Sequence, residues 1–300
     1  MKNDEIMVSV VCDVYNHEPY LRQCFDGFVM QKTNFKFEIL VHDDASTDKS
    51  ADIIMEYTNK YPNLFKPIIQ KENQYSKGIG IWKTYQFPRV KGKYVALCEG
   101  DDYWTDSMKL QTQVDYMETH LGYTMCFHNA SILNETDVPQ FPITPIAEGD
   151  YNKNQIFEKW IVPTASVMFK YDILMEITKE RQVFSGDINL FLTCASLGKI
   201  HGFYKRMSVY RIQHNGLTLG RLNISRANVY KKELEQSKFL FEKFGLDRKV
   251  FKKKYAGWEF KLFGVTYGIS FLLIALKANA PYTISLLIKR IVKTLIGYKK

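Results

Sequence analysis

Four apolar, β-branched runs in the first hundred residues alternate with segments of helical periodicity, and this alternation constrains the fold more than any other feature. The runs are residues 6–15, 37–44, 65–70 and 93–100. Apolar residues recur at helical spacing from Glu18 to about Met30, and again from Ser46, a candidate N-cap, to Tyr61 before a proline. Strands that alternate with helices predict an α/β protein with a mostly parallel sheet flanked by helices and right-handed crossovers.

Polar and acidic residues follow three of these runs. They are Tyr15-Asn16, Asp43-Asp44 and Glu99-Gly100-Asp101-Asp102. Ligands of parallel sheets bind at the carboxyl ends of the strands, so the three clusters are expected at one edge. A single acidic turn could simply cap the helix that begins near Asp106, but capping explains three clusters poorly. Because carboxylates this close destabilise one another unless a cation or hydrogen bonds compensate, this edge is predicted to be a ligand site.

Carboxylate oxygens at such an edge are typical ligands of a hard cation, Mn²⁺ or Mg²⁺, that shares its coordination with a bound diphosphate. The metal would neutralise the charge that builds on a leaving phosphate. Tyr15 could offer a flat face to a base, and Asp44 could accept hydrogen bonds from a base or a ribose. A core tyrosine and a helix-capping aspartate are the structural alternatives for these two residues.

Three stretches resemble, in order and spacing, the family-2 inverting glycosyltransferases of the GT-A fold, which transfer a sugar from a nucleotide-diphosphate donor. They are VSVVCDVYNHEPYLRQCFDGFVMQ, FEILVHDDASTDKSADIIMEY and GKYVALCEGDDYWTDSMKLQTQVDYM. The likeness covers roughly residues 7–120, with weaker matches to about 215. It implies a Rossmann-like GT-A sheet and a UDP-linked sugar donor. It also implies a glycan or lipid-linked acceptor, in the synthesis of bacterial surface polysaccharide.

The resemblance also implies roles for individual residues at the acidic edge. Tyr15 and Asp44 match the family residues that hold the nucleoside, and Asp101 and Asp102 match those that contact ribose, metal and diphosphate. Glu99 and His214 are the further candidates at the metal, with a surface histidine as the alternative for His214. Asn16 and Lys77 are added as candidate nucleotide contacts from their places in the sequence. Three of the matching segments depart from the family pattern. Glu99 stands where aspartate is commoner, Asp13 stands where proline is usual, and His214 lies one residue farther along than is usual.

A further departure is the segment ENQYSKGIGIW, residues 72–82, which replaces the family's Arg- and Asn-containing segment after the third strand. Lys77, Gly78 and Gly80 could still approach a phosphate there. A solvated lysine is the alternative interpretation of Lys77.

Inversion at the sugar requires a carboxylate that takes the proton from the attacking hydroxyl on the face opposite the diphosphate. The resemblance assigns this role to Asp187, at the start of a predicted helix that Gly198 ends. A helix N-cap is the alternative role of Asp187. The segment WIVPTASVMFK, residues 160–170, resembles the strand that lines the acceptor cleft, with Thr164 and Ser166 as candidate acceptor contacts.

Other classes of protein fit the pattern less well. A glycoside hydrolase uses two carboxylates but needs no acid cluster at several strand ends. A nucleotidyltransferase should open with a glycine- and arginine-rich phosphate loop, and DVYNHEPYLR is not one. A catalytically inactive, membrane-tethered nucleotide-sugar-binding or scaffold protein of the same fold is the remaining alternative, because Glu99 and His214 depart from the family.

The net charge of +9 is concentrated at one end of the chain. Residues 221–300 carry 18 Lys and Arg against 5 Asp and Glu, whereas the rest carries 23 against 27. We therefore predict a GT-A catalytic domain over 1–220, with a nucleotide-binding part at about 1–120 and an acceptor part at about 121–220. A helical basic extension follows over 221–300. A basic tail on an acidic body argues against a nucleic-acid-binding core and favours contact with anionic phosphate.

The tail has two apolar segments. Residues 262–276 are uncharged, but fifteen residues fall short of the roughly 20 that span a bilayer. Beyond them, one helical face carries Ile284, Leu287, Ile288, Ile291, Val292, Leu295 and Ile296, and the other carries Lys289, Arg290 and Lys293. This pattern predicts an interfacial helix on an anionic membrane. Packing on the catalytic domain or on a second subunit is the alternative.

The five cysteines are scattered, mostly within apolar runs, with neither a disulfide framework nor a zinc spacing. The first residues run directly into a strand pattern and lack the features of a signal peptide. We therefore predict reduced thiols and a cytoplasmic protein at the inner face of the cell membrane.

Overall fold

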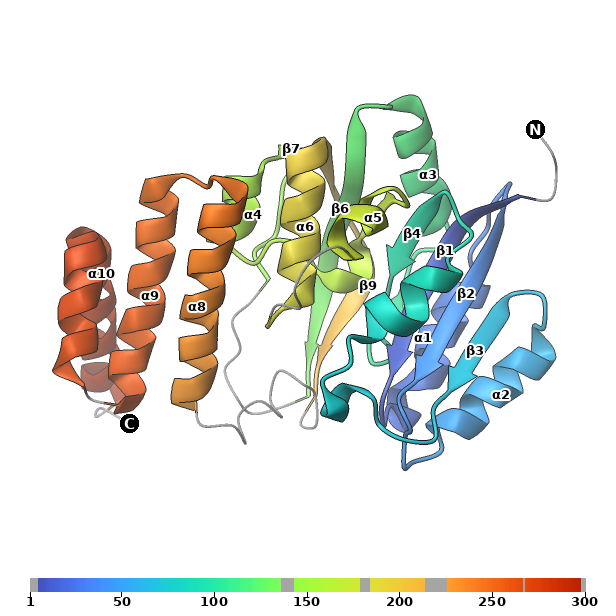
Figure 1. Ribbon diagram of the computed structural model, residues 1–300, viewed down its shortest axis with the longest axis horizontal. Helices are drawn as coiled ribbons and strands as arrows, with labels where there is room; N and C mark the ends of the chain where they lie inside the picture. The colour runs from blue at the N-terminus through green and yellow to red at the C-terminus, as the bar shows by residue number, and fades with distance from the viewer. Residues whose placement is uncertain (1–4, 136–142, 179–183, 214–225, 267, 298–300) are drawn as a thin grey trace. The chain divides into compact units, whose positions relative to one another are not determined.

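The computed structural model describes residues 5–135, 143–178, 184–213, 226–266 and 268–297 (Figure 1). Packing divides the chain into two units. The first comprises residues 1–152, 159–182 and 190–212, and the second comprises residues 153–158, 183–189 and 213–300. The predicted boundary near residue 220 stays a prediction, because the two units interleave along the chain.

The described residues of the first unit form one nine-stranded sheet, in the order β3-β2-β1-β4-β8-β6-β9-β5, with β7 paired to β9. The strands are β1 (Ile6–Val14), β2 (Lys36–Asp43), β3 (Phe65–Ile69), β4 (Tyr94–Leu97), β5 (Tyr103–Trp104), β6 (Tyr123–Asn134), β7 (Gly149–Tyr151), β8 (Met168–Lys170) and β9 (Lys199–Ile212). The first four strands are mutually parallel. Beyond β4 the sheet is mixed, because β8 runs antiparallel to both β4 and β6.

The helices of the first unit include those that the sequence predicts near residues 18–30, 46–61 and 187–197. They are α1 (Glu18–Val29), α2 (Ser50–Lys60), α3 (Lys109–Thr119), α5 (Ile173–Thr178) and the part of α6 (Gly186–Leu197) from Leu190 onward. Short 3₁₀ turns η1 (Tyr75–Lys77), η3 (Phe87–Arg89) and η4 (Thr164–Ser166) and a π-helical turn η2 (Trp82–Gln86) complete it. The prediction that Ser46 caps the second helix is wrong, because α2 begins at Ser50 and Ser46 bonds to Asp43 instead.

The core explains why the first strands are so apolar. Val8, Val10 and Cys12 of β1 are fully buried, as are the α1 side chains Phe25 and Phe28. The ring of Phe28 meets the buried Trp104 of β5 edge-on at 4.7 Å. Gly27 is required at this crossing, because a Cβ there would lie 2.8 Å from the Trp104 carbonyl oxygen. Close packing of α1 on β5 therefore fixes the turn that connects β4 to β5.

The second unit is helical in its described part. It contains α4 (Lys153–Glu158), the start of α6, and three long helices, α8 (Arg226–Phe244), α9 (Arg248–Thr266) and α10 (Ile269–Gly297). The helices α8, α9 and α10 lie side by side in Figure 1. Lys153 of α4 donates to the carbonyl oxygen of Phe244 in α8, and Lys254 of α9 donates to that of Phe157 in α4. These two bonds hold α4 to the long helices.

Candidate functional site

The loops after β1 and β2 are locked to each other at the carboxyl edge of the sheet. Asn16 and Ala45 both adopt left-handed backbone conformations, with φ of +56° and +60°. The Ser46 hydroxyl donates to Asp43 and accepts the backbone N–H of Asn16 at 2.9 Å. The side-chain oxygen of Asn16 in turn accepts the N–H of Thr47 at 2.8 Å. The strained backbone is thus held by reciprocal bonds, which is typical of a preorganised site.

Tyr15 and Asp44, the predicted nucleoside contacts, have different surroundings. Tyr15 is 46 % exposed at the edge, so its ring is available to a ligand. Asp44 is 5 % exposed, and its carboxylate accepts the backbone N–H groups of Gln74 and Tyr75 at 2.7 and 3.0 Å. Asp44 therefore orders the segment 72–82, which replaces the family's Arg- and Asn-containing segment. A direct contact of Asp44 with a nucleoside stays a prediction.

The segment 72–82 folds as a compact turn rather than as an open phosphate loop. Gly78 follows the 3₁₀ turn η1 with φ of +77°, a conformation that favours glycine. Lys77 pairs with Glu72, and both side chains are largely exposed. The predicted contact between Lys77 and a phosphate would require this ion pair to open, and it stays a prediction.

Asp13, where the family usually has proline, joins a polar network beneath the edge. Gln86 donates to the Asp13 carboxylate at 2.7 Å and to the Leu40 carbonyl oxygen at 3.1 Å. Arg89 holds Gln86 by a 2.6 Å bond and reaches the Val41 carbonyl oxygen at 2.8 Å. Burial raises the pKa of Asp13 to about 6, against the opposing effect of the hydrogen bonds that it accepts. The network ties β1 and β2 to the turns η2 and η3.

The acidic turn after β4 contains a buried carboxylate that is only half satisfied. One oxygen of Asp102 accepts the backbone N–H of Arg211 at 2.8 Å. Its other oxygen, Oδ2, is buried and has no hydrogen-bond partner among the described residues. Burial, and then the neighbouring Asp101, raise the pKa of Asp102 well above its usual range. An unpaired buried carboxylate oxygen is costly, so a cation or donor beside it would lower the free energy of the folded state.

Asp101 lies beside His17, a residue for which no role was predicted from the sequence. Its carboxylate oxygen lies 4.0 Å from Nε2 of His17, and both side chains are 16 % exposed. Gly100 permits this approach, because a Cβ there would lie 2.8 Å from Nδ1 of His17. Glu99 is half-buried, and its carbonyl oxygen accepts the N–H of Asp102 at 3.1 Å. The three acids therefore occupy distinct positions within one tight turn.

Arg211, at the end of β9, joins this turn to distant parts of the first unit. Its guanidinium donates to the Asp101 carbonyl oxygen at 2.9 Å, to Gln23 at 2.7 Å and to Glu135. It also lies over the ring of Tyr20, 4.6 Å from the centroid. Sequence reasoning missed this arginine, because its partners are up to 188 positions away and no local pattern marks them.

The donor set of the turn fits a hard divalent cation. Asp101 and Asp102 supply carboxylate oxygens, and the orphaned Oδ2 of Asp102 is the kind of buried atom that a cation would satisfy. No group of three His, Cys, Asp or Glu side chains in the described ranges forms a complete metal site by itself. A metal that shares its coordination with a diphosphate needs fewer protein ligands. His214, the fourth predicted ligand, lies outside the described residues.

The predicted acceptor residues lie in η4, which packs on β4, and both are buried. Thr164 is 7 % exposed, and Ser166 is fully buried with its hydroxyl donating to the Pro163 carbonyl oxygen at 2.6 Å. An acceptor contact by Ser166 would require the turn η4 to open, and both assignments stay predictions. In the same segment Trp160 is 37 % exposed and meets Tyr210 of β9 edge-on at 5.2 Å. The sequence reasoning gave this aromatic pair no role.

Asp187, the predicted base, lies in the first turn of α6, as expected. Its carboxylate accepts the backbone N–H of Ile188 at 2.8 Å, and the residue is half-buried. Asp187 belongs to the second unit and the acidic turn belongs to the first. Its role as base therefore stays a prediction.

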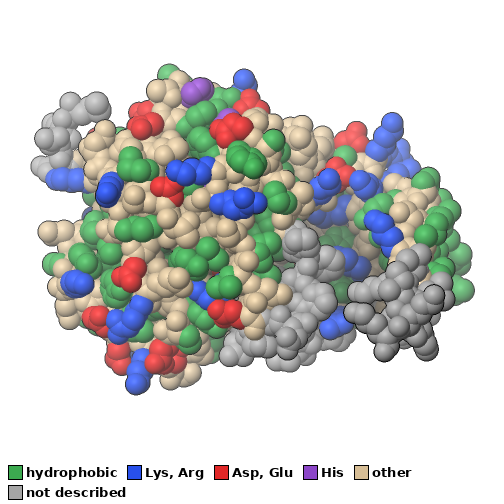
Figure 2. All heavy atoms as spheres, turned by 180° about the vertical axis from the view of Figure 1, so that it is seen from behind, with side chains coloured by type: hydrophobic (Ala, Val, Ile, Leu, Met, Phe, Trp, Pro, Cys, Tyr) green, Lys and Arg blue, Asp and Glu red, His purple; other side chains and the backbone are tan. Residues whose placement is uncertain are grey.

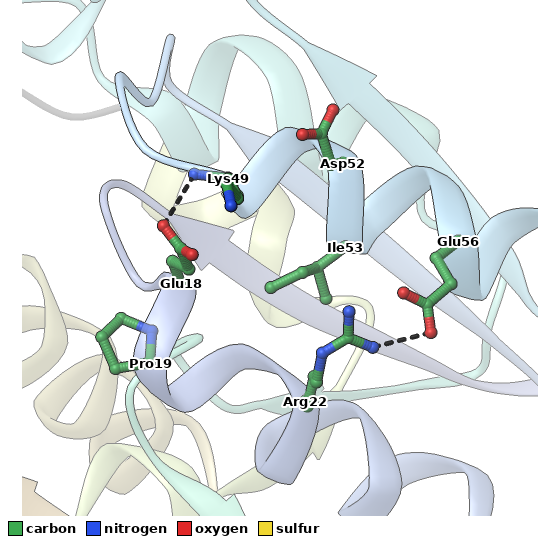
Figure 3. A pocket seen from close by; sticks show the side chains of 7 residues that line it. All are labelled: Glu18, Pro19, Arg22, Lys49, Asp52, Ile53 and Glu56. Carbon is green, nitrogen blue, oxygen red and sulfur yellow. Dashed lines mark hydrogen bonds and ion pairs between the residues drawn. The ribbon is translucent and has the colours of Figure 1, made fainter.

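A hollow of about 560 Å³ lies between the first turns of α1 and α2 (Figure 3). Its lining residues are Glu18, Pro19, Arg22, Lys49, Asp52, Ile53 and Glu56. Glu18 accepts the backbone N–H of Lys49 at 3.0 Å, and Arg22 pairs with Glu56 at 2.6 Å. These bonds join the two helices, and the predicted site residues lie elsewhere, on the loops that precede them.

A parallel sheet half with two interlocked loops and an acidic turn at its carboxyl edge, followed by a mixed half, is the GT-A fold of nucleotide-sugar enzymes. The chain matches the glycosyl transferase family 2 model over residues 9–177, more than half of its length. It therefore belongs to glycosyltransferase family 2.

Two relatives illustrate the similarity in sequence. An uncharacterized protein of Mycobacterium tuberculosis is 35 % identical over 217 residues, which cover 70 % of this chain and 60 % of that protein. The chain thus spans about 60 % of the length of that relative. A putative teichuronic acid biosynthesis glycosyltransferase of Bacillus subtilis, TuaG, is 23 % identical over 246 residues, 80 % of this chain and 93 % of that protein.

Two solved structures share the fold. The S. aureus protein TarS, residues 1–349, in complex with UDP-GlcNAc, matches 92 % of this chain and 80 % of its own, with a TM-score of 0.65 and 18 % identity. The mannosyltransferase PcManGT of Pyrobaculum calidifontis, in complex with GDP-Man and Mn²⁺, matches 97 % of this chain and 81 % of its own. Its TM-score is 0.60 and its identity is 15 %.

Proposed function

We propose that the chain is a metal-dependent inverting glycosyltransferase that transfers a sugar from a UDP-linked donor to a glycan or lipid-linked acceptor. The observation that carries the proposal is the acidic turn Glu99–Asp102, whose buried Asp102 oxygen lacks a partner among the described residues, next to the exposed Tyr15. Membership of family 2 supports the reaction class, and relatives in fold that bind UDP-GlcNAc or GDP-Man support a nucleotide-sugar donor.

In this proposal the edge of the sheet holds the donor. Tyr15 stacks on the base, Asn16 keeps the loops after β1 and β2 in place, and Asp44 orders the segment 72–82 and contacts the nucleoside. Asp101 and Asp102 would hold Mn²⁺ or Mg²⁺ at the diphosphate. The cation supplies charge neutralisation at the leaving diphosphate. His17 lies beside the carboxylate of Asp101, with Nε2 4.0 Å from its oxygen. Arg211 keeps the acidic turn in register with β9 through its bond to the Asp101 carbonyl oxygen.

Asp187 takes the proton from the acceptor hydroxyl in this proposal. A general base must stand on the face of the sugar opposite the leaving group, and negative charge is favoured in the first turn of a helix, where Asp187 lies. Glu99 joins Asp101 and Asp102 as a proposed ligand, and because it is one methylene longer than the aspartate usual in the family, its carboxylate reaches farther from the turn.

The acceptor side of the proposal is a surface polysaccharide or its lipid-linked precursor. The likeness to a putative teichuronic acid biosynthesis glycosyltransferase supports this class. The basic extension would bring the enzyme to the anionic inner face of the cell membrane, where lipid-linked acceptors are present. No nucleic acid is involved in this proposal.

A screen of nucleotide-sugars for turnover, with and without Mn²⁺, tests the proposed function. Release of UDP from one or a few UDP-sugars, dependent on metal and faster with an acceptor, is the expected result. Nucleotide binding without release of product from any donor would favour the inactive scaffold instead. A matched control is the Asp187→Asn variant, which should bind the donor and release product far more slowly.

A further inference from the structure

The helix α10 is broken near its middle. Asn279 has φ of −158° and ψ of 88°, an extended conformation inside an otherwise helical segment. The hydroxyl of Thr283 lies 2.9 Å from the carbonyl oxygen of Ala275, although these residues would lie about 12 Å apart along a straight helix. The two halves of α10, residues 269–278 and 280–297, therefore bend back on each other.

Contacts with α9 confirm the hairpin. Gly257 of α9 faces the ring of Tyr282, and Gly264 faces the guanidinium of Arg290. The second half of α10 therefore runs parallel to α9, and the first half must run the opposite way to connect them. In Figure 1 the two halves of α10 occupy the end of the helical unit beyond α9.

The break satisfies its own backbone polar groups. The Asn279 side chain accepts the N–H of Tyr282 at 3.2 Å, as an N-cap does. Pro281 has no N–H, so it leaves no donor unpaired in this first turn. Thr283, which is fully buried, lies within bonding distance of the carbonyl oxygens of Ala275 and Asn279. A break satisfied in this way is compatible with hydrocarbon, where unpaired backbone groups are costly.

Both halves direct large apolar side chains outward. The exposed residues and fractions are Ile269 69 %, Leu273 60 %, Ile274 41 %, Ile284 48 %, Ile288 55 % and Ile291 56 %. We call these six residues the outer stripe. Residues Ile269–Ile291 are long and apolar enough to cross a membrane, but only 11 % of their most apolar 18-residue stretch is buried. The core helix of a globular protein would be mostly buried, so the outer stripe needs another apolar surface.

Charge identifies that surface. Glu259 is the last acidic residue of the chain, and residues 260–300 contain seven Lys and Arg. Apolar and basic side chains share the surface of the C-terminal helices at the right of Figure 2. An apolar stripe with basic neighbours and no acid fits an anionic lipid surface, whereas a second copy of this chain would place like charges against each other.

We propose that α10 enters a single leaflet of an anionic membrane as a helical hairpin and does not cross the bilayer. The first half has about ten residues and a length of about 15 Å, half of the roughly 30 Å hydrocarbon core. The second half carries Lys289 and Arg290 within its apolar run, so it too is unsuited to cross the core. The proposal rests on the membrane contact of the proposed function and defines its geometry.

Flotation on vesicles tests the outer stripe. Full-length protein should float with vesicles of phosphatidylcholine and phosphatidylglycerol, and Leu273→Gln or Ile288→Gln should each weaken binding at least about tenfold. The matched controls Ser270→Gln and Ser285→Gln change exposed polar positions in the same two halves and should bind as the unmodified chain does. Equal loss from stripe and control variants would overturn the proposal, and so would vesicle-free dimers that the stripe variants convert to monomers in light scattering.

Cysteine labelling separates the hairpin from a span. The five native cysteines are buried, so cysteines introduced as Ser270→Cys and Lys289→Cys can be labelled selectively. In sealed vesicles a hairpin leaves both positions reactive to an impermeant maleimide added outside, whereas a span protects one of them until detergent is added. Protection of one position would overturn the hairpin. UDP binding by the same variants reports on the donor site separately, so failure of the hairpin is distinguishable from failure of the proposed function.

Discussion

The acidic edge of the sheet and the hairpin α10 differ in what their side chains contact. At the edge, Asp44, Asp102 and Arg211 each bond to backbone groups of segments far away in the sequence. Along α10, the outer stripe consists of apolar side chains that are 41 to 69 % exposed. The first region is rigid before a ligand arrives, which suits a small polar ligand. The second has an apolar surface that suits an extended lipid phase.

Because their contacts differ, the two regions should be sensitive to different amino-acid substitutions. Single substitutions of polar residues at the edge should alter nucleotide binding or catalysis, whereas replacing an apolar residue of the outer stripe should alter membrane binding.

Asp187→Asn should lower the transfer rate by at least about a hundredfold and leave donor affinity close to that of the unmodified chain. The amide keeps the shape of the carboxylate and removes the proton acceptor, whose usual contribution is of this size. Steady-state turnover together with calorimetric UDP binding checks the prediction. Near-normal turnover would mean that another acid is the base.

Arg211→Lys should lower the free energy of unfolding by about 1 to 3 kcal/mol, because lysine cannot reproduce the bonds to Gln23, Glu135 and the Asp101 carbonyl oxygen. Arg22→Lys is the matched control, since Arg22 pairs with Glu56 with both side chains more than half exposed. Such exposed pairs contribute little, so this variant should unfold within about 0.5 kcal/mol of the unmodified chain. If urea unfolding shows equal losses of unfolding free energy in the two variants, the stabilising role assigned to the bonds of Arg211 is contradicted.

Lys109→Met should change how stability depends on pH. Lys109 is fully buried against Gln113 and the ring of Trp104, and burial lowers its pKa to about 7. Between pH 7 and about 10.5 the unfolded chain binds more protons than the folded chain at this residue, so its destabilising effect diminishes as pH rises. The free energy of unfolding of the unmodified chain should therefore rise, relative to that of Lys109→Met, by up to about 1.4 kcal/mol per pH unit in this window.

Urea unfolding at several pH values from 7 to 9 measures that difference. Lys71→Met, at an exposed lysine, controls for the loss of one positive charge. A constant difference between the unmodified chain and Lys109→Met across the window would contradict the lowered pKa of Lys109.

Much of the acidic edge could be predicted from the sequence, because local features define it. The runs that became β1, β2 and β4 are apolar enough to be buried on both faces, and the rule that ligands bind at carboxyl ends placed Tyr15, Asp44 and Asp101 together. The GT-A class is confirmed by the fold and the family match. Pro281 lies at the break in α10, but no break was predicted from it.

What could not be predicted depends on pairing between distant segments. The bond from the Arg211 backbone to Asp102 joins residues 109 positions apart, and it exists because β5 pairs with β9. The burial of Ser166 follows from its place between β4 and α3, where its carbonyl oxygen accepts a bond from Gln113. The limits of the apolar segments also differ from the prediction. The uncharged run 262–276 is divided between the end of α9 and the start of α10, and α10 joins its later part to the face that begins at Ile284 across the break at Asn279.

Calorimetric titration of UDP with and without Mn²⁺, on the unmodified chain and on Asp101→Ala, tests the central claim most directly. The account predicts that Mn²⁺ strengthens UDP binding by the unmodified chain, and that Asp101→Ala abolishes this gain while its unfolding transition is unchanged. Asp115→Ala, an exposed aspartate on α3, is the control and should bind as the unmodified chain does. UDP affinity that is the same with and without Mn²⁺, or that survives in Asp101→Ala, would contradict the assignment of the acidic turn as a metal and diphosphate site.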